Sequence, residues 1–126
     1  MDFAKFHAGL VIAARWLFWP ALALVIWGEL TPGVSLHIWD KAEHFLAYFG
    51  LAGLATVALG ARRNTLWAAL ALIALGGALE ILQGYTGRDP DIYDELANTI
   101  GAAAGWFAGL GVGALCRRLV GGRAPD

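Results

Sequence analysis

The stretch 80–98, EILQGYTGRDPDIYDELAN, decides the fold because its charged residues lie between two uncharged apolar segments. Residues 65–79 precede it and residues 99–116 follow it, and neither segment contains Asp, Glu, Lys or Arg. Ionisable groups at the ends of such segments are costly in hydrocarbon and usually mark function. We interpret the stretch as the ends of two membrane-spanning helices and the turn between them.

The composition of the whole chain is that of a membrane protein. Of its 126 residues, 59% are hydrophobic and 15% are charged, and the mean hydropathy is +0.60. A soluble domain of this length carries more charge. The first apolar run lacks a small-residue cleavage site, so we expect no cleavable signal peptide. The single cysteine, Cys116, excludes a disulfide within one chain.

Turn-forming residues divide the apolar sequence into four segments. The breaks are Pro32-Gly33, the run 62–64 (Arg-Arg-Asn), and Gly87 with Pro90. A helix needs about 20 residues to cross the hydrocarbon core. We therefore predict an all-α integral membrane bundle of four transmembrane helices, about 10–30, 41–60, 65–84 and 95–116, in a single domain over residues 1–126.

Local patterns predict the helix ends and one helix face. Asp40, with Glu43 three residues later, resembles a capping box at the start of the second helix, and Asp91 or Asp94 is expected to cap the fourth. Glycine recurs at every fourth position of the fourth segment, which allows close approach of a neighbouring backbone within the bundle or between copies in a homo-oligomer. These glycines are Gly101, Gly105, Gly109 and Gly113.

Charge asymmetry predicts the orientation. With four spans, seven basic residues fall on one side, at the two termini and in the turn between the second and third helices: Lys5, Arg15, Arg62, Arg63, Arg117, Arg118 and Arg123. Only Lys41 and Arg88 fall on the other side. Basic residues favour the cytoplasmic side, so we expect both termini in the cytoplasm and the stretch 80–98 at the outer face.

Polar residues at the outer ends of the second, third and fourth helices share faces at a spacing of three, four or seven residues. Three polar stripes at one depth are tolerated only when they face each other. We predict a small polar cavity that opens outward and binds a ligand through Asp40, Lys41, His44, Tyr48, Glu80, Gln83, Arg88, Asp94 and Asn98.

The same residues carry a resemblance to a known family. The chain contains D-K-x-x-H-F-x-x-Y at 40–48, E-x-x-Q at 80–83, an arginine at 88, and D-x-x-x-N-x-x-G-x-x-x-G at 94–105. Over residues 15–118 it resembles the VanZ-like membrane proteins. The resemblance implies a multi-pass protein of the bacterial cytoplasmic membrane, linked to tolerance of teicoplanin, a lipoglycopeptide that acts at the outer face.

Three functions stay open. In the first, Lys41 and Arg88 hold a phosphate or carboxylate of a membrane lipid, a lipid-linked envelope precursor or a lipoglycopeptide. In the second, the site is enzymatic, with Glu80 or Asp94 and His44 as an acid–base pair or as ligands of a divalent metal. In the third, the cluster only holds the helices together.

A purely structural role is the alternative at several of these residues. Glu80 is expected to pair with Arg88 or His44, while Gln83 and Asn98 are expected to form hydrogen bonds between helices. Only one histidine lies in the proposed core and no HExxH motif occurs, so we predict no metal and no cofactor. The scattered basic residues argue against nucleic acid as a partner.

Overall fold

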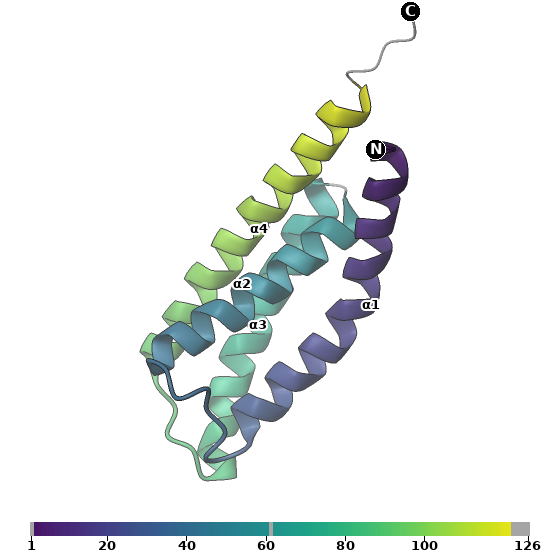
Figure 1. Cartoon of the computed structure of the whole chain (residues 1–126). Helices are drawn as coiled ribbons and strands as arrows, with labels where there is room; N and C mark the ends of the chain where they lie inside the picture. Colours follow the sequence, from purple (N-terminus) through teal and green to yellow (C-terminus); the bar gives the residue numbers. More distant parts are fainter. Residues whose placement is uncertain (1, 61, 122–126) are drawn as a thin grey trace, which may run out of the picture.

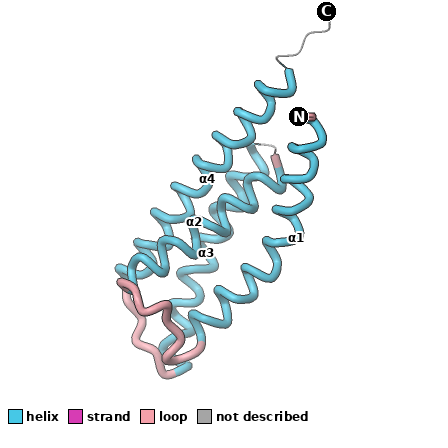
Figure 2. The backbone as a smooth tube through the Cα atoms, in the orientation of Figure 1, coloured by secondary structure: helices cyan, strands magenta, loops and turns pink. Residues whose placement is uncertain are grey.

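The computed structural model of the chain describes residues 2–60 and 62–121. Within these ranges the chain is all-helical, with α1 at Phe3–Leu30, α2 at Asp40–Leu59, α3 at Arg62–Thr86 and α4 at Ile92–Gly121, and it contains no strand (Figure 2). All four helices are long and apolar enough to cross a membrane. The prediction of an all-α chain with four such helices is confirmed.

The helices form an elongated bundle (Figure 1). The first turn of α1 and the last turn of α4 lie at one end, while the loops 31–39 and 87–91 lie together at the other end. The largest interface between two helices is that of α2 with α4. The loop end therefore collects the last turns of α1 and α3 and the first turns of α2 and α4.

Glycines of α4 allow this close contact with α2. A Cβ atom at Gly101 would collide with the carbonyl oxygen of Phe45, and one at Gly105 would collide with that of Phe49. At Gly109 it would lie 2.6 Å from the Cβ of Thr56. The predicted glycine face is thus confirmed for these three positions as packing within the bundle.

Gly113 continues the spacing of that face but does not contact α2 there. A Cβ there would lie 3.3 Å from the side chain of Arg117, which belongs to α4 itself. The contact with α2 has ended by this level, because α4 continues beyond the end of α2.

We expect Gly105→Ala to destabilise the protein by about 1–3 kcal/mol, the usual cost of inserting a methyl group into a packed interface. The methyl group would push α4 away from the backbone of α2 at Phe49. Gly111→Ala is the matched control, because no atom lies within 4 Å of a Cβ at Gly111. Thermal unfolding in detergent measures both variants, and equal midpoints would contradict the packing role of Gly105.

All four helices begin earlier than predicted, α1 by the most. Asp2 caps α1, and its Oδ1 accepts hydrogen bonds from the backbone N–H groups of Ala4 (3.1 Å) and Lys5 (3.2 Å). The run 62–64 forms the first turn of α3 rather than a hairpin. The reversal before it uses Gly60, whose φ of 70° is readily adopted by glycine.

The predicted capping box at Asp40 is wrong. The N-cap of α2 is Trp39, and Asp40 is the first helical residue. Glu43 instead binds the preceding loop, where its Oε1 accepts hydrogen bonds from Ser35 Oγ (2.6 Å) and Leu36 N (2.8 Å). This arrangement holds the loop 31–39 against α2 and leaves the carboxylate of Asp40 free for other partners.

The start of α4 follows one of the two predicted alternatives. Asp91 immediately precedes the helix, and its Oδ1 accepts a hydrogen bond from Tyr93 N (2.8 Å). Asp94 lies one turn further along and is buried. Its side chain therefore belongs to the interior of the bundle.

Candidate functional site

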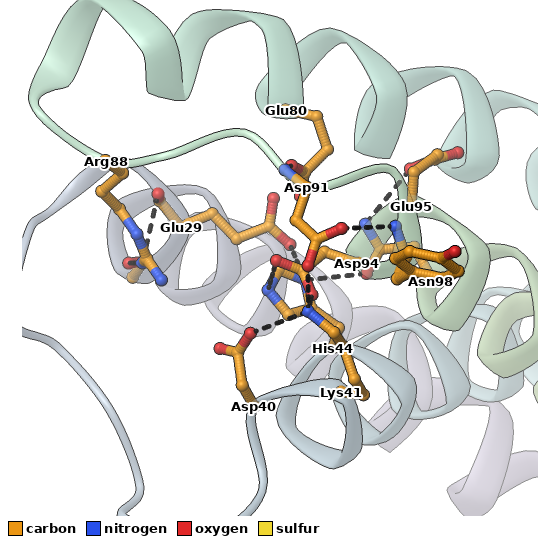
Figure 3. Close-up of polar contacts among 12 residues, drawn as sticks. Glu29, Asp40, Lys41, His44, Glu80, Arg88, Asp91, Asp94, Glu95 and Asn98 are labelled. Carbon is orange, nitrogen blue, oxygen red and sulfur yellow. Dashed lines mark hydrogen bonds and ion pairs between the residues drawn. The ribbon is translucent and has the colours of Figure 1, made fainter.

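Charged and polar side chains from all four helices meet at the loop end of the bundle (Figure 3). The buried members are Glu29, His44, Tyr48, Glu80, Gln83, Asp94 and Asn98. Helical spacing brings residues of each helix to one face, and the packing of α4 on α2 brings the faces together. We call this set, with Asp40, Lys41, Asp91 and Glu95, the polar cluster.

Lys41 connects α2 with the start of α4 through carboxylates. Its Nζ lies 2.6 Å from Asp91 Oδ2 and 3.3 Å from Asp40 Oδ2, and it also forms an ion pair with Asp94 Oδ1. The Lys41 ammonium group, together with the N–H of Tyr93, holds the pKa of Asp91 below its ordinary value. Asp91 is therefore an anion at neutral pH. The ammonium group of Lys41 is thus already surrounded by three acidic side chains.

His44 is oriented by an amide from α4. Asn98 Nδ2 donates to Glu95 Oε2 (3.2 Å), which turns Asn98 Oδ1 towards His44. That oxygen lies 3.0 Å from His44 Nδ1, so Nδ1 carries the hydrogen and donates it. The other ring nitrogen, Nε2, lies 3.6 Å from Asp94 Oδ2. The predicted hydrogen bond between helices is confirmed for Asn98.

Glu29 belongs to the cluster although the sequence-based set omitted it. Its Oε1 lies 3.7 Å from His44 Nδ1, and its Oε2 accepts a hydrogen bond of 3.5 Å from the hydroxyl of Tyr48. Glu29 follows the uncharged run 16–28 at the end of α1. Glu80 was predicted to belong to the site because it follows a long uncharged run at the end of α3. The same pattern could have predicted Glu29.

Glu80 and Arg88 do not pair. Glu80 Oε2 accepts a hydrogen bond from the backbone N–H of Asp91 (3.0 Å). Arg88 donates from one guanidinium nitrogen to the carbonyl oxygens of Gly28 (2.9 Å) and Glu29 (3.3 Å). These carbonyls belong to the last turn of α1, where backbone acceptors lack helical partners. The expected Glu80–Arg88 pair is wrong because Arg88 caps α1.

Three buried polar atoms of the cluster have no hydrogen-bond partner among the described residues. They are Glu29 Oε1, Glu80 Oε1 and Gln83 Nε2. Gln83 lies one turn beyond Glu80 on α3, and the two carboxyl groups of Glu29 and Glu80 are close enough to influence each other electrostatically. Buried polar groups are rarely left without partners, so these three atoms are the unsatisfied positions of the cluster.

The buried polar side chains of the cluster contact one another. One hollow of about 300 Å³ lies at the opposite end of the bundle, beside Arg15 and Arg117. Another, of about 340 Å³, lies on α4 beside Tyr93 and Leu96, and Glu95 of the polar cluster lines it. A ligand would therefore reach the cluster by displacing side chains such as the exposed Asp40.

Comparison of the chain with protein-family profiles, with curated protein sequences and with solved structures returns no match. The resemblance to the VanZ-like proteins therefore stays a prediction. What is shown is a chain of four membrane-length helices that carries a buried polar cluster at one end.

Proposed function

We propose that this chain is a VanZ-like multi-pass protein of the bacterial cytoplasmic membrane that recognises a polar headgroup at the outer face. The ligand would be a membrane lipid, a lipid-linked envelope precursor or a lipoglycopeptide, and its recognition would contribute to teicoplanin tolerance. The proposal joins the resemblance in sequence to the position of the polar cluster at one end of the bundle.

The distribution of basic residues supports an orientation with both termini in the cytoplasm. Lys5, Arg15, Arg62, Arg63, Arg117 and Arg118 lie at the end of the bundle opposite the polar cluster, while Arg123 lies outside the described residues. Excess Lys and Arg favours the cytoplasmic side. The loops 31–39 and 87–91 and the polar cluster would then face outward.

The observation that carries the proposal is the presence of buried polar atoms without partners. Glu29 Oε1, Glu80 Oε1 and Gln83 Nε2 lie in the membrane-length helices at this end. Each such atom costs about 1–3 kcal/mol when it is left unsatisfied. A headgroup that offers hydroxyl or ammonium groups to Glu29 and Glu80 would remove this cost at their oxygens, and a headgroup oxygen would accept from Gln83 Nε2.

The geometry favours a ligand with amine or hydroxyl groups over one bound only through its phosphate. Lys41 contacts three carboxylates, and Arg88 donates to two backbone carbonyls. The expected phosphate-binding cations are therefore already occupied, whereas the groups without partners include two carboxylates. Phosphatidylethanolamine and amino-sugar-bearing ligands have the complementary chemistry.

Native mass spectrometry of the detergent-purified protein tests the proposal. The wild type should retain a defined lipid or envelope-precursor adduct, and Glu80→Gln should retain at least tenfold less of it. Glu43→Gln is the matched control, because that carboxylate binds the loop 31–39 outside the cluster. Equal adducts in all three proteins, or none in the wild type, would contradict headgroup recognition.

A structural role is the second candidate, because the cluster joins all four helices through direct contacts. In that case Glu80→Gln would change only the melting temperature. Circular dichroism recorded during heating of the same samples separates the two roles.

A further inference from the structure

We propose that Asp40, His44 and Asp94 bind a divalent metal ion. Asp40 and His44 lie one turn apart on α2, Asp94 comes from α4, and one ligand atom from each lies within 4.8 Å of the others. The inference deepens the proposed function and rests on it for the role of the ion at the headgroup. It departs from the prediction, made from the sequence, that the chain binds no metal.

The distance between His44 and Asp94 fits two ligands of one ion. Nε2 and Oδ2 are 3.6 Å apart, which is longer than the range of about 2.7–3.2 Å for an N–H···O hydrogen bond. Nitrogen and oxygen ligands lie about 2.1 Å from a zinc ion, and two of them at a tetrahedral angle are about 3.4 Å apart. Asp40 Oδ2 lies 3.3 Å from Lys41 Nζ, and because Asp40 is exposed its other oxygen can turn towards the same ion.

The orientation of His44 leaves the correct nitrogen for a metal. Nδ1 donates its hydrogen to Asn98 Oδ1, and Glu95 holds that amide in place. In the neutral ring the lone pair of Nε2 then faces the carboxylate of Asp94, so two acceptors oppose each other and a cation between them would satisfy both. Metal-binding histidines almost always donate their second N–H to an oxygen acceptor in this way.

The charge of the cluster supplies an independent reason for a cation. Six carboxyl groups gather here: Glu29, Asp40, Glu80, Asp91, Asp94 and Glu95. Within the described ranges, Lys41 forms ion pairs with three of them, while Arg88 donates only to the backbone carbonyl of Glu29. Uncompensated charge in a buried site is costly, and a divalent ion would neutralise part of the excess.

A buried carboxylate beside the proposed ligands strengthens this point. Glu29 is more than nine-tenths buried, its Oε1 makes no hydrogen bond, and it lies 3.7 Å from the ring of His44. Figure 3 shows its side chain reaching across from α1 towards His44 and Asp94. This oxygen is an acceptor without a donor beside the ring, and a positive ion there would satisfy it.

Lys41 and the ion would use different oxygens of Asp94. The ammonium group contacts Oδ1, while Oδ2 faces His44. Imidazole together with carboxylates suits Zn²⁺, and three protein ligands leave a coordination position open. In this arrangement a phosphate or hydroxyl oxygen of a headgroup would occupy the open position, so the ion would join the acidic site to the headgroup.

Metal titration of the full chain in detergent tests the proposal. Protein stripped with a chelator should take up one Zn²⁺ per chain, measured by calorimetry and by elemental analysis of the dialysed sample. Asp94→Asn and His44→Ala should each lower the affinity at least tenfold. Asn98→Ala should lower it by about 10–100-fold, the range seen when the group that orients a metal-binding histidine is lost. His37→Ala, a change in the exposed loop, should leave it unchanged.

Co²⁺ bound to the wild type gives a second readout that needs no variant to fold. A visible spectrum with nitrogen ligation, displaced stoichiometrically by Zn²⁺, is expected. No stoichiometric ion in the wild type, or equal uptake by the wild type and a natively helical His44→Ala variant, would overturn the metal site.

Mass spectrometry of lipid adducts on stripped and Zn²⁺-loaded protein separates this inference from the proposed function. Adducts without any metal uptake would leave headgroup recognition standing and remove the metal site. Metal uptake without adducts would establish the ion and remove headgroup recognition.

Discussion

Lys41→Met is expected to lower the free energy of unfolding by about 2–3 kcal/mol. Removing one partner of a buried ion pair typically costs about 3–5 kcal/mol, because the other charge is left uncompensated. The cost here is smaller because the side chain of Lys41 is 23% exposed. The largest part of the loss comes from Asp94, because its buried carboxylate would lose its ion pair. Its side chain is 7% exposed, and Lys41 is its one permanently charged partner among the described residues.

Thermal and chemical unfolding in detergent measure this effect. Lys5→Met is the matched control: its ion pair with Asp2 is exposed, and such pairs contribute at most about 1 kcal/mol. Adding Asp94→Asn to Lys41→Met should recover part of the lost stability, because it removes the unpaired carboxylate. Equal losses for Lys41→Met and Lys5→Met would show that the contacts of Lys41 contribute no more than a surface pair.

Asn98→Leu is expected to cost about 2–4 kcal/mol. Asn98 is fully buried, accepts from His44 and donates to Glu95. A leucine of similar size would leave both of these partners without their hydrogen bond, at about 1–3 kcal/mol for the buried His44 and less for the half-buried Glu95. His44 would also lose the contact that sets its ring orientation, so metal affinity should fall together with stability.

The unfolding midpoint and the Zn²⁺ titration are measured on the same preparation. Thr99→Val is the control, because it removes a longer hydrogen bond of 3.4 Å to the same Glu95 from a half-buried position. A midpoint for Asn98→Leu that matches that of Thr99→Val would show that the bond between Asn98 and His44 does not stabilise the bundle.

Much of the site follows from helical spacing. Asp94, Asn98, Gly101 and Gly105 recur at intervals of four, three and four, which predicts one face of a helix, and all four residues are buried. His44 and Tyr48 repeat this pattern on α2. These predictions succeeded because a residue's face on a helix depends only on its position in that helix.

Other parts failed because they depended on contacts between distant segments. Arg88 was one of two expected partners of Glu80, with His44, but it lies at the end of α1 and donates to Gly28 and Glu29, about 60 residues earlier in the chain. Local sequence rules do not describe this distant partner. The expected cap at Asp40 failed for a local reason, since α2 begins at Asp40 itself and Trp39 is its N-cap.

The sequence by itself determined the number of helices, the approximate limits of each and the polar face of each of the last three. The physical reason is that, in hydrocarbon, backbone hydrogen bonds must be made within the helix and polar side chains must face inward. Only the tertiary structure decided that Glu29 joins the cluster, that Lys41 is held by three acids, and that His44 lies against Asp94. Those pairings depend on how far each helix extends and how closely α4 packs on α2, and no spacing within a single helix encodes these distances.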